Sequence, residues 1–497
     1  MFFRKPSPTP PWKTKSESFS KSKDTHNNNN HFTFITNNQL RYTLFACLFF
    51  ASWFLILHFL SPLTTTTTTT PTTTITTLQK NTKTAATCDG SGPFYIYTLP
   101  QRFNLGLLKH CQNLNIYTNM CPYVANNGLG QPISAVTTTT TTAWYATHQF
   151  IAEMIIHARL ENHPCRTWDP NKALLFYIPF YGGLHASSMF REANHTLRDS
   201  LAVDLISFIK TQTFFNRHNG NDHFLALGRT AWDFMRKESG PDFGANILLN
   251  LPPVKNMSVL TVERQPWNGS NQIGVPYPSY FHPTTVTDMV TWQNKVREAK
   301  RPHLFSFVGG KRKGLEKAKI RDEIVKQCGE STQCELVECG GNGNGGSKCY
   351  NPMAVLDVMM KSRFCLQAPG DSFTRRSTFD SVLAGCIPVF FSPHTAYMQY
   401  AWYLPQEARE YSVYIDEKES GVAGKRIIED VLMNVSSEEV KRMREVVINL
   451  IPRITYAHPN ASGGGGDVGF KDAVDVALHG LSLLVRDKIQ SSGSAEI

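Results

Sequence analysis

The 497-residue sequence lacks several motifs that would identify a reaction on their own. It has no P-loop pattern, no G-x-S-x-G and no H-E-x-x-H, so P-loop nucleotidases, α/β-hydrolases and helical zinc proteases are each without their signature. It also has no Asp-X-Asp pair, with which sugar-nucleotide enzymes of the single-Rossmann type usually hold a metal ion. If the chain binds a diphosphate, we expect arginines and a helix N-terminus to neutralise it in place of a metal.

Charged side chains are missing from residues 42–60, a run of 19 mostly apolar residues. A helix of that length is roughly 28 Å long, close to the hydrocarbon thickness of a thin bilayer. A cleaved signal peptide and a buried core helix are the alternatives, but a signal peptide usually has a shorter apolar run nearer to the start of the chain. We therefore expect a retained transmembrane signal-anchor helix at residues 42–60.

The segments on either side of this run differ in composition. Residues 1–41 are polar and asparagine-rich, and their seven Lys and Arg against two Asp and Glu account for half of the formal net charge of +10. The charge therefore does not indicate nucleic-acid binding; it predicts a disordered cytosolic tail and a type II membrane protein. Residues 61–87 are threonine-rich and predict an extended stalk. All five glycosylation sequons follow the span, at Asn194, Asn256, Asn268, Asn434 and Asn460.

Ten of the 11 cysteines also follow the span, and an even number in an oxidising compartment permits disulfides. Four of them cluster in a Gly- and Asn-rich stretch, namely Cys328, Cys334, Cys339 and Cys349. A zinc site is the competing interpretation, but paired C-x₂₋₄-C spacing and an interleaved histidine are missing, so we expect disulfides within a loop and no metal. Cys365 and Cys386 fall within apolar strands and are interpreted as buried thiols.

Beyond residue 88 the sequence alternates short apolar runs with amphipathic stretches, which predicts parallel sheets covered by helices on both faces. The expected strands are residues 93–99, 173–181, 223–228, 259–263 and 304–310, and the expected helices include residues 144–160 and 201–210. The pattern loosens over residues 265–303, which we interpret as a linker. We therefore predict two Rossmann-like α/β domains, at residues 88–295 and 296–490.

Residues 362–391 predict a strand, a turn, a helix and a second strand. We expect Ser372 to cap a helix over residues 373–384, which would place Ser372, Arg376 and Asp380 along one face with Arg375 beside them. A helix that starts at the carboxyl edge of a sheet attracts anions, so the two arginines predict a diphosphate site, with Asp380 available to ribose or sugar hydroxyls. The alternative is a surface ion pair between Arg376 and Asp380.

A second basic turn follows the strand at residues 304–310. Gly309 and Gly310 precede Lys311, Arg312 and Lys313, which makes this turn another candidate phosphate contact.

Five segments together resemble the exostosin-type glycosyltransferases of plants, and within them the xyloglucan galactosyltransferase branch. These segments are residues 169–184, 221–234, 266–283, 305–310 and 363–391, and the resemblance extends over about residues 88–485. It implies a Golgi type II membrane enzyme of the GT-B fold, with an N-terminal acceptor domain and a C-terminal nucleotide-sugar donor domain. It also implies an inverting transfer from a UDP-sugar to a cell-wall polysaccharide, without an obligatory metal or other cofactor.

The resemblance assigns residues to roles. Gly370, Ser372, Arg375, Arg376 and Asp380 match the donor motif, and Gly309 and Lys311 join them as donor-binding candidates. For the general base that inversion requires, Asp222 and His223 are the candidates in the acceptor domain, and Glu263 is another. His223 is equally well interpreted as a structural histidine. Residues 185–190 depart from the family pattern on the acceptor side.

The leading expectation is transfer of galactose from UDP-galactose to xylosyl side chains of xyloglucan. The close alternative keeps the chemistry with another sugar, such as arabinose or galacturonic acid. An alternative from another class is a non-catalytic glycan-binding or scaffold protein. Partners would be the UDP-sugar, the polysaccharide and the membrane, with homo-oligomers or hetero-oligomers with other Golgi transferases also compatible.

Overall fold

The computed structural model describes residue 88 and residues 90–493, apart from residues 134–142, 238–241, 268, 341–347, 418–426 and 462–468. The predicted cytosolic tail, signal-anchor helix and stalk lie outside these residues. Among the helices that the structure does describe, none is both long and apolar enough to cross a membrane.

The first sheet has five parallel strands in sequential order, from β1 to β5. Its strands are β1 (Phe94–Ile96), β2 (Leu175–Ile178), β3 (His223–Thr230), β4 (Ser258–Glu263) and β5 (Gln272–Gly274). The α-helices of this part are α2 (Cys121–Val124), α3 (Ala152–Glu161), α4 (Gly182–Met189), α5 (His195–Lys210), α6 (Thr213–Arg217) and α7 (Pro252–Asn256). We call this part the first lobe.

The second sheet is also parallel, but its order is β10-β9-β8-β6-β7. Its strands are β6 (His303–Gly309), β7 (Cys334–Glu338), β8 (Ser362–Gln367), β9 (Ile387–Phe390) and β10 (Val413–Tyr414). The helices around it are α8 (Val286–Glu298), α9 (Ile320–Glu330), α10 (Pro352–Met360), α11 (Arg376–Leu383), α13 (Ile427–Met433) and α14 (Ser437–Ile454), and α15 (Ala473–Gly493) ends the described chain. We call the β6–β10 sheet with α8–α14 the second lobe.

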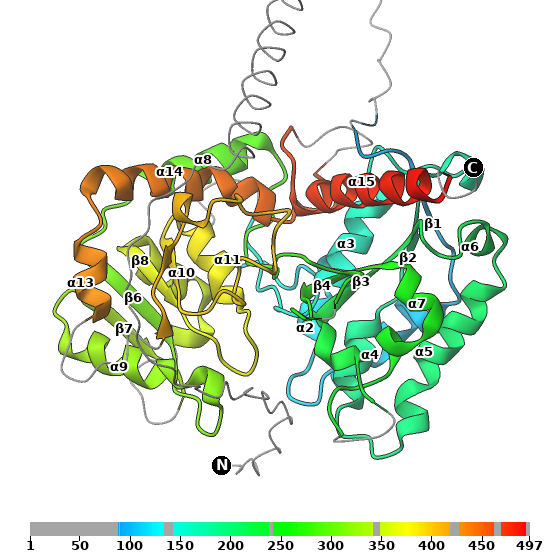
Figure 1. Ribbon diagram of the computed structural model, residues 1–497, viewed down its shortest axis with the longest axis horizontal. Coiled ribbons are helices and arrows are strands. Elements are labelled where there is room, and N and C mark those ends of the chain that lie inside the picture. Colours follow the sequence, from blue (N-terminus) through cyan, green and yellow to red (C-terminus); the bar gives the residue numbers. More distant parts are fainter. Residues whose placement is uncertain are drawn as a thin grey trace, which may run out of the picture. The chain divides into compact units, whose positions relative to one another are not determined.

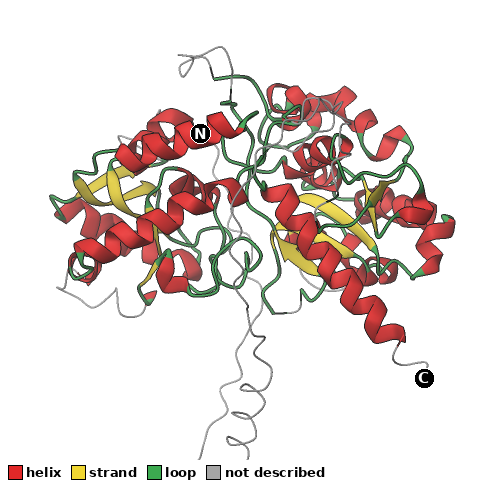
Figure 2. Ribbon diagram, turned by 90° about the horizontal axis from the view of Figure 1, so that it is seen from above, coloured by secondary structure: helices red, strands yellow, loops and turns green. Residues whose placement is uncertain are grey.

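Helices cover both faces of each sheet (Figures 1 and 2), which confirms the predicted α/β layers with parallel strands. The first sheet separates two apolar cores because successive side chains of a strand point to opposite faces. Phe176 and Ile178 enter one core, while Leu175 and Tyr177 enter the other, which continues into the second lobe. The near-continuous apolar strands in the sequence reflect this burial on both sides.

The segment interpreted as a linker, residues 265–303, contains a strand and a helix that the sequence did not reveal. The short strand β5 adds the edge of the first sheet, and α8 begins at a capping box between Thr285 and Asp288. Only Met289, Trp292 and Val296 of α8 are buried, and its other positions are largely polar. The predicted domain boundary at residue 296 falls within α8 and stays a prediction.

Two predicted helices have different limits in the structure. The chain before α3 is extended, since Tyr145 bridges Pro132 and Trp144 bridges Phe281, so the helix starts at residue 152 rather than 144. Helix α5 starts six residues earlier than predicted, because the side chain of Asn194 caps it by accepting from the Leu197 amide.

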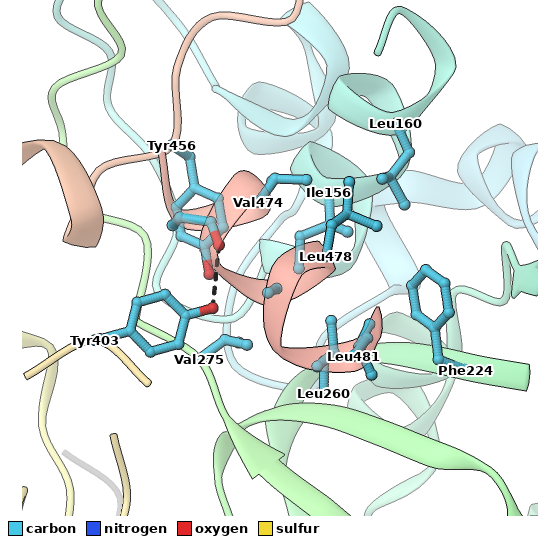
Figure 3. A pocket seen from close by; sticks show the side chains of 12 residues that line it. Ile156, Leu160, Phe224, Leu260, Val275, Tyr403, Tyr456, Val474, Leu478 and Leu481 are labelled. Atoms are coloured by element: carbon cyan, nitrogen blue, oxygen red, sulfur yellow. Dashed lines mark hydrogen bonds between the residues drawn. The ribbon is translucent and has the colours of Figure 1, made fainter. Parts of the chain in front are cut away.

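The C-terminal helix α15 packs against α3 and β2 of the first lobe. Figure 3 shows the small cavity under this helix, lined by Ile156, Leu160, Phe224, Leu260, Val275, Tyr403, Tyr456, Ala473, Val474, Ala477, Leu478 and Leu481. The Tyr403 hydroxyl donates to the Ala473 carbonyl at 3.0 Å. The lining is apolar apart from two tyrosine hydroxyls, so this cavity belongs to the packing of α15 and offers no groups for catalysis.

All ten cysteines after the predicted span form disulfides. The pairs are Cys88–Cys165, Cys111–Cys121, Cys328–Cys334, Cys339–Cys349 and Cys365–Cys386. Disulfides in the Gly-rich cluster were expected. The interpretation of Cys365 and Cys386 as free buried thiols is wrong, because β8 is paired with the start of β9 and this pairing brings the two side chains together.

Candidate functional site

The order of the second sheet changes direction between β6 and β8. The chain leaves β6 toward β7 on one side, and leaves β8 toward β9 on the other. Ligands of such sheets bind beyond the carboxyl ends of the strands at this switch point, because the two connections diverge there. Two segments lie at this place, the turn after Gly309 and residues 368–375. We call residues 368–375 the donor loop.

Arg321 joins the two sides of the switch point. Its buried guanidinium donates to the carbonyls of Gly310 at 2.9 Å, Ala368 at 2.9 Å and Pro369 at 2.6 Å. Burial, with the nearby charges of Arg375 and Arg312, lowers its pKa to about 9. Sequence reasoning missed this residue, because nothing separated it from the other basic residues around it.

The glycine turn is closely packed. A β-carbon on Gly310 would lie 1.9 Å from the backbone oxygen of Cys339, so only glycine fits where the chain passes β7. Lys311, a predicted donor-binding residue, is exposed. Arg312 pairs with Asp371 of the donor loop, with 3.6 Å between Nε and Oδ1. The basic turn and the donor loop are thus neighbours, as the sequence suggested.

Helix α11 begins at Arg376, and Arg375 is its N-cap residue. The prediction that Ser372 caps a helix starting at residue 373 is therefore wrong. Residues 370–372 form a tight turn in which the Gly370 amide donates to the Ser372 carbonyl at 2.9 Å. Of the four residues expected on one helical stretch, only Arg376 and Asp380 lie on α11.

Arg375 is the half-buried cation of the donor loop. Its guanidinium lies against Gly370, and no residue in the described part of the chain accepts a hydrogen bond from it. Burial lowers its pKa, while Tyr277 and the Asp371 and Glu263 carboxylates act in the opposite direction. An arginine with unused donors at a switch point is suited to bind a phosphate.

The neighbouring Arg376 points elsewhere. Its Nη1 donates to the Thr147 carbonyl at 3.3 Å, its Nη2 donates to the Tyr280 hydroxyl, and its guanidinium lies 4.4 Å from the centre of the Tyr280 ring. Its Nε lies 3.4 Å from Oδ2 of Asp380. The ion pair with Asp380 therefore exists, but in the interior rather than at the surface.

Asp380 is 3% exposed, and its Oδ1 accepts from the Ser279 hydroxyl at 2.5 Å. Burial raises the pKa of this carboxyl group, and Arg376 acts against the shift. Both carboxylate oxygens already have partners within the protein, and the expected contact with ribose stays a prediction. Asp380 and Arg376 instead fasten α11 to residues 275–283, which connect the two lobes.

The predicted catalytic pair, Asp222 and His223, lies at the edge of the first sheet that the amino ends of its strands form. Asp222 precedes β3 and His223 begins it, so both lie at the amino ends of the strands. Asp222 Oδ1 is 2.7 Å from His223 Nδ1, and the Tyr97 hydroxyl is 2.8 Å from His223 Nε2. The imidazole also packs against the rings of Phe176 and Tyr97, with ring centroids 4.8 Å and 5.5 Å away. Both ring nitrogens have partners, and because the pair lies at the amino ends of the strands, the structure does not bring it to the donor residues.

Glu263 ends β4 at the carboxyl edge of the first sheet and contacts the donor loop. Its Oε2 accepts from the Thr374 amide at 3.0 Å and from the Thr374 hydroxyl, and its Oε1 accepts from the Trp232 indole at 2.9 Å. Of the three candidate bases, Glu263 is the one that contacts the donor loop.

The model of the Exostosin GT47 domain matches residues 90–430 of the chain. The chain is 62% identical over 403 residues to the probable xyloglucan galactosyltransferase GT17 of Arabidopsis thaliana, covering 81% of this chain and 85% of that protein. It is 42% identical to xyloglucan galactosyltransferase MUR3 of the same plant, covering 78% of this chain and 61% of that protein. It is 36% identical to xyloglucan-specific galacturonosyltransferase 1, over 81% and 58%.

Among solved structures, the pneumococcal O-GlcNAc transferase GtfA in complex with UDP and GlcNAc has a TM-score of 0.30 and 10% sequence identity, covering 62% of this chain and 57% of that one.

Proposed function

The chain belongs to the exostosin GT47 family of glycosyltransferases, and on this premise we propose that it transfers galactose from UDP-galactose to xylosyl side chains of xyloglucan. The names of its relatives supply the sugar and the acceptor, with the galactosyltransferases more similar to this chain than the galacturonosyltransferase. The observation that carries the proposal is the Arg375 guanidinium at the switch point, whose donors are unused within the described residues.

Two parallel sheets with helices on both faces favour the GT-B fold, with the first lobe as acceptor domain and the second as donor domain. In this assignment the diphosphate of UDP lies at the donor loop, over Gly370. Arg375 binds the phosphate that carries the sugar, while Arg312 and Lys311 add positive charge from the basic turn. These groups neutralise the charge that develops on UDP as the bond from the anomeric carbon to the phosphate oxygen breaks.

Inversion requires one displacement, in which an acceptor hydroxyl attacks the anomeric carbon from the face opposite to UDP. We assign the general-base role to Glu263, which takes the proton of that hydroxyl on Oε2. Glu263 is 0% exposed, so the acceptor reaches Oε2 only when the Thr374 hydroxyl gives up its bond, which couples arrival of the acceptor to a rearrangement of the donor loop. The electron pair of the broken bond leaves with UDP.

We also propose that residues 42–60 anchor the enzyme in the Golgi membrane as a type II protein with its catalytic part in the lumen. The five disulfides support an oxidising compartment. Protease treatment of sealed Golgi vesicles should leave the catalytic part intact and remove an epitope placed at the N-terminus. Digestion of the catalytic part in sealed vesicles would show that the orientation is the opposite one.

The activity is tested with the full chain in detergent, a panel of UDP-sugars and a xyloglucan that lacks galactose. We expect galactose on xylosyl residues in the product, determined by digestion and mass spectrometry. Preferred incorporation of galacturonic acid or arabinose would support the same chemistry with another sugar. Neither transfer nor hydrolysis of any UDP-sugar would support the non-catalytic alternative.

A further inference from the structure

Four aromatic rings from separate segments meet beside the donor loop. Trp232 lies in the short 3-10 helix Ala231–Phe234 and Trp267 follows β4, while Phe373 belongs to the donor loop and His394 follows β9. Trp267 is central, since its ring centroid lies 6.0 Å from Trp232, 6.0 Å from Phe373 and 5.5 Å from His394. Two rings come from each lobe. We call these four residues the aromatic cluster.

The aromatic cluster presents a surface to solvent. Trp267 is 53% exposed, and the other three rings are half-buried. The backbone of Trp267 is held, because its amide donates to Gln265 Oε1 at 2.9 Å and the Gln265 amide donates to Gln272 Oε1 at 2.8 Å. Burying a large aromatic ring stabilises the folded protein. A large ring that is instead held half exposed is typical of a binding surface.

This surface borders the groups that the proposed mechanism uses. The Trp232 indole donates to Glu263 Oε1, and Phe373 is the neighbour of Thr374, whose amide donates to Oε2 of the same carboxylate. Arg375 follows at the next position. The Lys317 ammonium lies 5.2 Å from the centre of the Phe373 ring, on the side of the basic turn. A ligand on the aromatic cluster would therefore lie against the donor loop and against Trp232 and Thr374, the residues that cover the buried Glu263 carboxylate.

His394 adds a polar group to this surface. Its Nδ1 is buried and has no hydrogen-bond partner within the described residues. A ligand hydroxyl that turns the half-buried ring would reach this atom and offset the desolvation cost of leaving it without a partner.

We propose that the aromatic cluster binds a neutral pyranose ring of the acceptor polysaccharide, with the sugar face stacked on Trp267 and a sugar hydroxyl bonded to His394. The proposal rests on the proposed function, since it places the acceptor beside Glu263. A pyranose ring has an apolar C–H face and polar edges, which matches an aromatic surface with few polar groups around it. A nucleobase also stacks on aromatic rings, but half of this cluster belongs to the first lobe rather than to the sheet that carries the donor loop.

The test uses Trp267→Ala and Trp267→Phe in the full chain, with Trp168→Ala as the matched control. Trp168 is 77% exposed and precedes β2, at the amino side of the first sheet. We expect Trp267→Ala to raise the acceptor KM about tenfold or more, which corresponds to about 1.4 kcal/mol. The KM for UDP-galactose and the affinity for UDP should stay unchanged. Trp267→Phe should recover most of the loss, and Trp168→Ala should behave as wild type.

Two results would overturn the proposal. One is an unchanged acceptor KM in Trp267→Ala. The other is a weakened affinity for UDP, which would assign the cluster to the nucleobase. Binding of xyloglucan oligosaccharides without any donor, followed by tryptophan fluorescence, separates this inference from the proposed activity. A wild-type chain that binds the oligosaccharide through Trp267 but transfers no galactose would support the aromatic cluster and contradict the proposed reaction.

Discussion

The guanidinium of Arg375 occupies the space that a side chain on Gly370 would need. A β-carbon at Gly370 would lie 1.8 Å from Nη2 of Arg375. The glycine therefore lets the arginine lie flat on the donor loop, where a phosphate can reach it.

Gly370→Ala should leave folding nearly unchanged, because the atoms that must move belong to the end of a flexible side chain. We expect the KM for UDP-galactose to rise about tenfold, since the guanidinium is displaced from its position, while the melting temperature stays within a few degrees. Gly310→Ala is the contrasting variant, because its β-carbon would meet backbone and should lower the melting temperature. An unchanged KM in Gly370→Ala would argue against Arg375 as the phosphate ligand.

Arg375→Ala should lower the affinity for UDP by about 1.5–3 kcal/mol, the range for hydrogen bonds to charged groups. Arg375→Lys should recover only part of this, because an ammonium cannot offer two parallel donors. Isothermal titration with UDP measures both. Arg376→Ala should behave differently, with a lower melting temperature, since it removes contacts with Tyr280 and Thr147 and leaves Asp380 without its cation. If the two alanine variants had the same profile, the division of roles between these arginines would be wrong.

Glu263→Gln should reduce kcat by about 10²-fold or more with little effect on the KM for UDP-galactose, because the amide cannot take a proton from the acceptor. Asp222→Asn is the matched control, as its carboxylate is equally buried but lies at the amino edge. This control should mainly lower thermal stability, through its lost pairing with Arg217. A loss of turnover confined to Asp222→Asn would return the base to the Asp222–His223 pair.

Removing the disulfide between β8 and β9 should cost about 3 kcal/mol of stability, the entropic value for a closed loop of 21 residues. We expect Cys365→Ala/Cys386→Ala to melt several degrees below wild type, as measured by differential scanning calorimetry. Alkylation of the unfolded wild-type chain without reductant should leave both thiols unlabelled. Labelling of both cysteines under these conditions would show that the bond is absent in solution.

Acid should destabilise the fold through His282. This residue is 0% exposed, lies between Thr147 and the Tyr456 carbonyl, and burial lowers its pKa to about 4. Between pH 6.5 and pH 4 the unfolded chain binds a proton that the folded chain does not, so stability falls as the pH falls through this window. The difference between its folded and unfolded pKa amounts to about 3 kcal/mol.

The variant His282→Gln should therefore lose less stability than wild type between pH 7 and pH 4, even if it is less stable at pH 7. The measure is the difference between variant and wild type, since Glu153, whose pKa burial raises to about 7, acts in the opposite direction. His110→Gln, at an exposed histidine, is the control. Parallel stability curves for His282→Gln and wild type would contradict the low pKa.

The sequence allowed the two parallel sheets and the unit around α11 to be predicted, because strands buried on both faces read as continuous apolar runs. It did not reveal β5 or most of α8. Only one narrow face of α8 is buried, and the polar residues on its other faces obscure the apolar periodicity. Pairing of Cys365 with Cys386 depends on which strands are neighbours in the sheet, and the sequences of the two strands do not predict that order.

The candidate site was predicted in part. The donor loop and the basic turn do meet, but two adjacent arginines differ in direction because one caps the helix and the other begins it. The preference for Asp222 and His223 over Glu263 did not use one signal that the sequence contains. His223 begins an apolar run while Glu263 ends one, and only the carboxyl ends of the strands face the ligand edge of a parallel sheet.

Helix α15 closes the first lobe with residues that follow the second sheet in the sequence. Until they arrive, the apolar surface around Ile156, Leu160 and Phe224 has nothing to cover it. The first lobe therefore cannot bury this surface until the chain beyond the second sheet has been synthesised. A premature stop before residue 473 would leave an intact donor loop beside an unfinished neighbour, and we expect such a product to be degraded rather than inactive and stable.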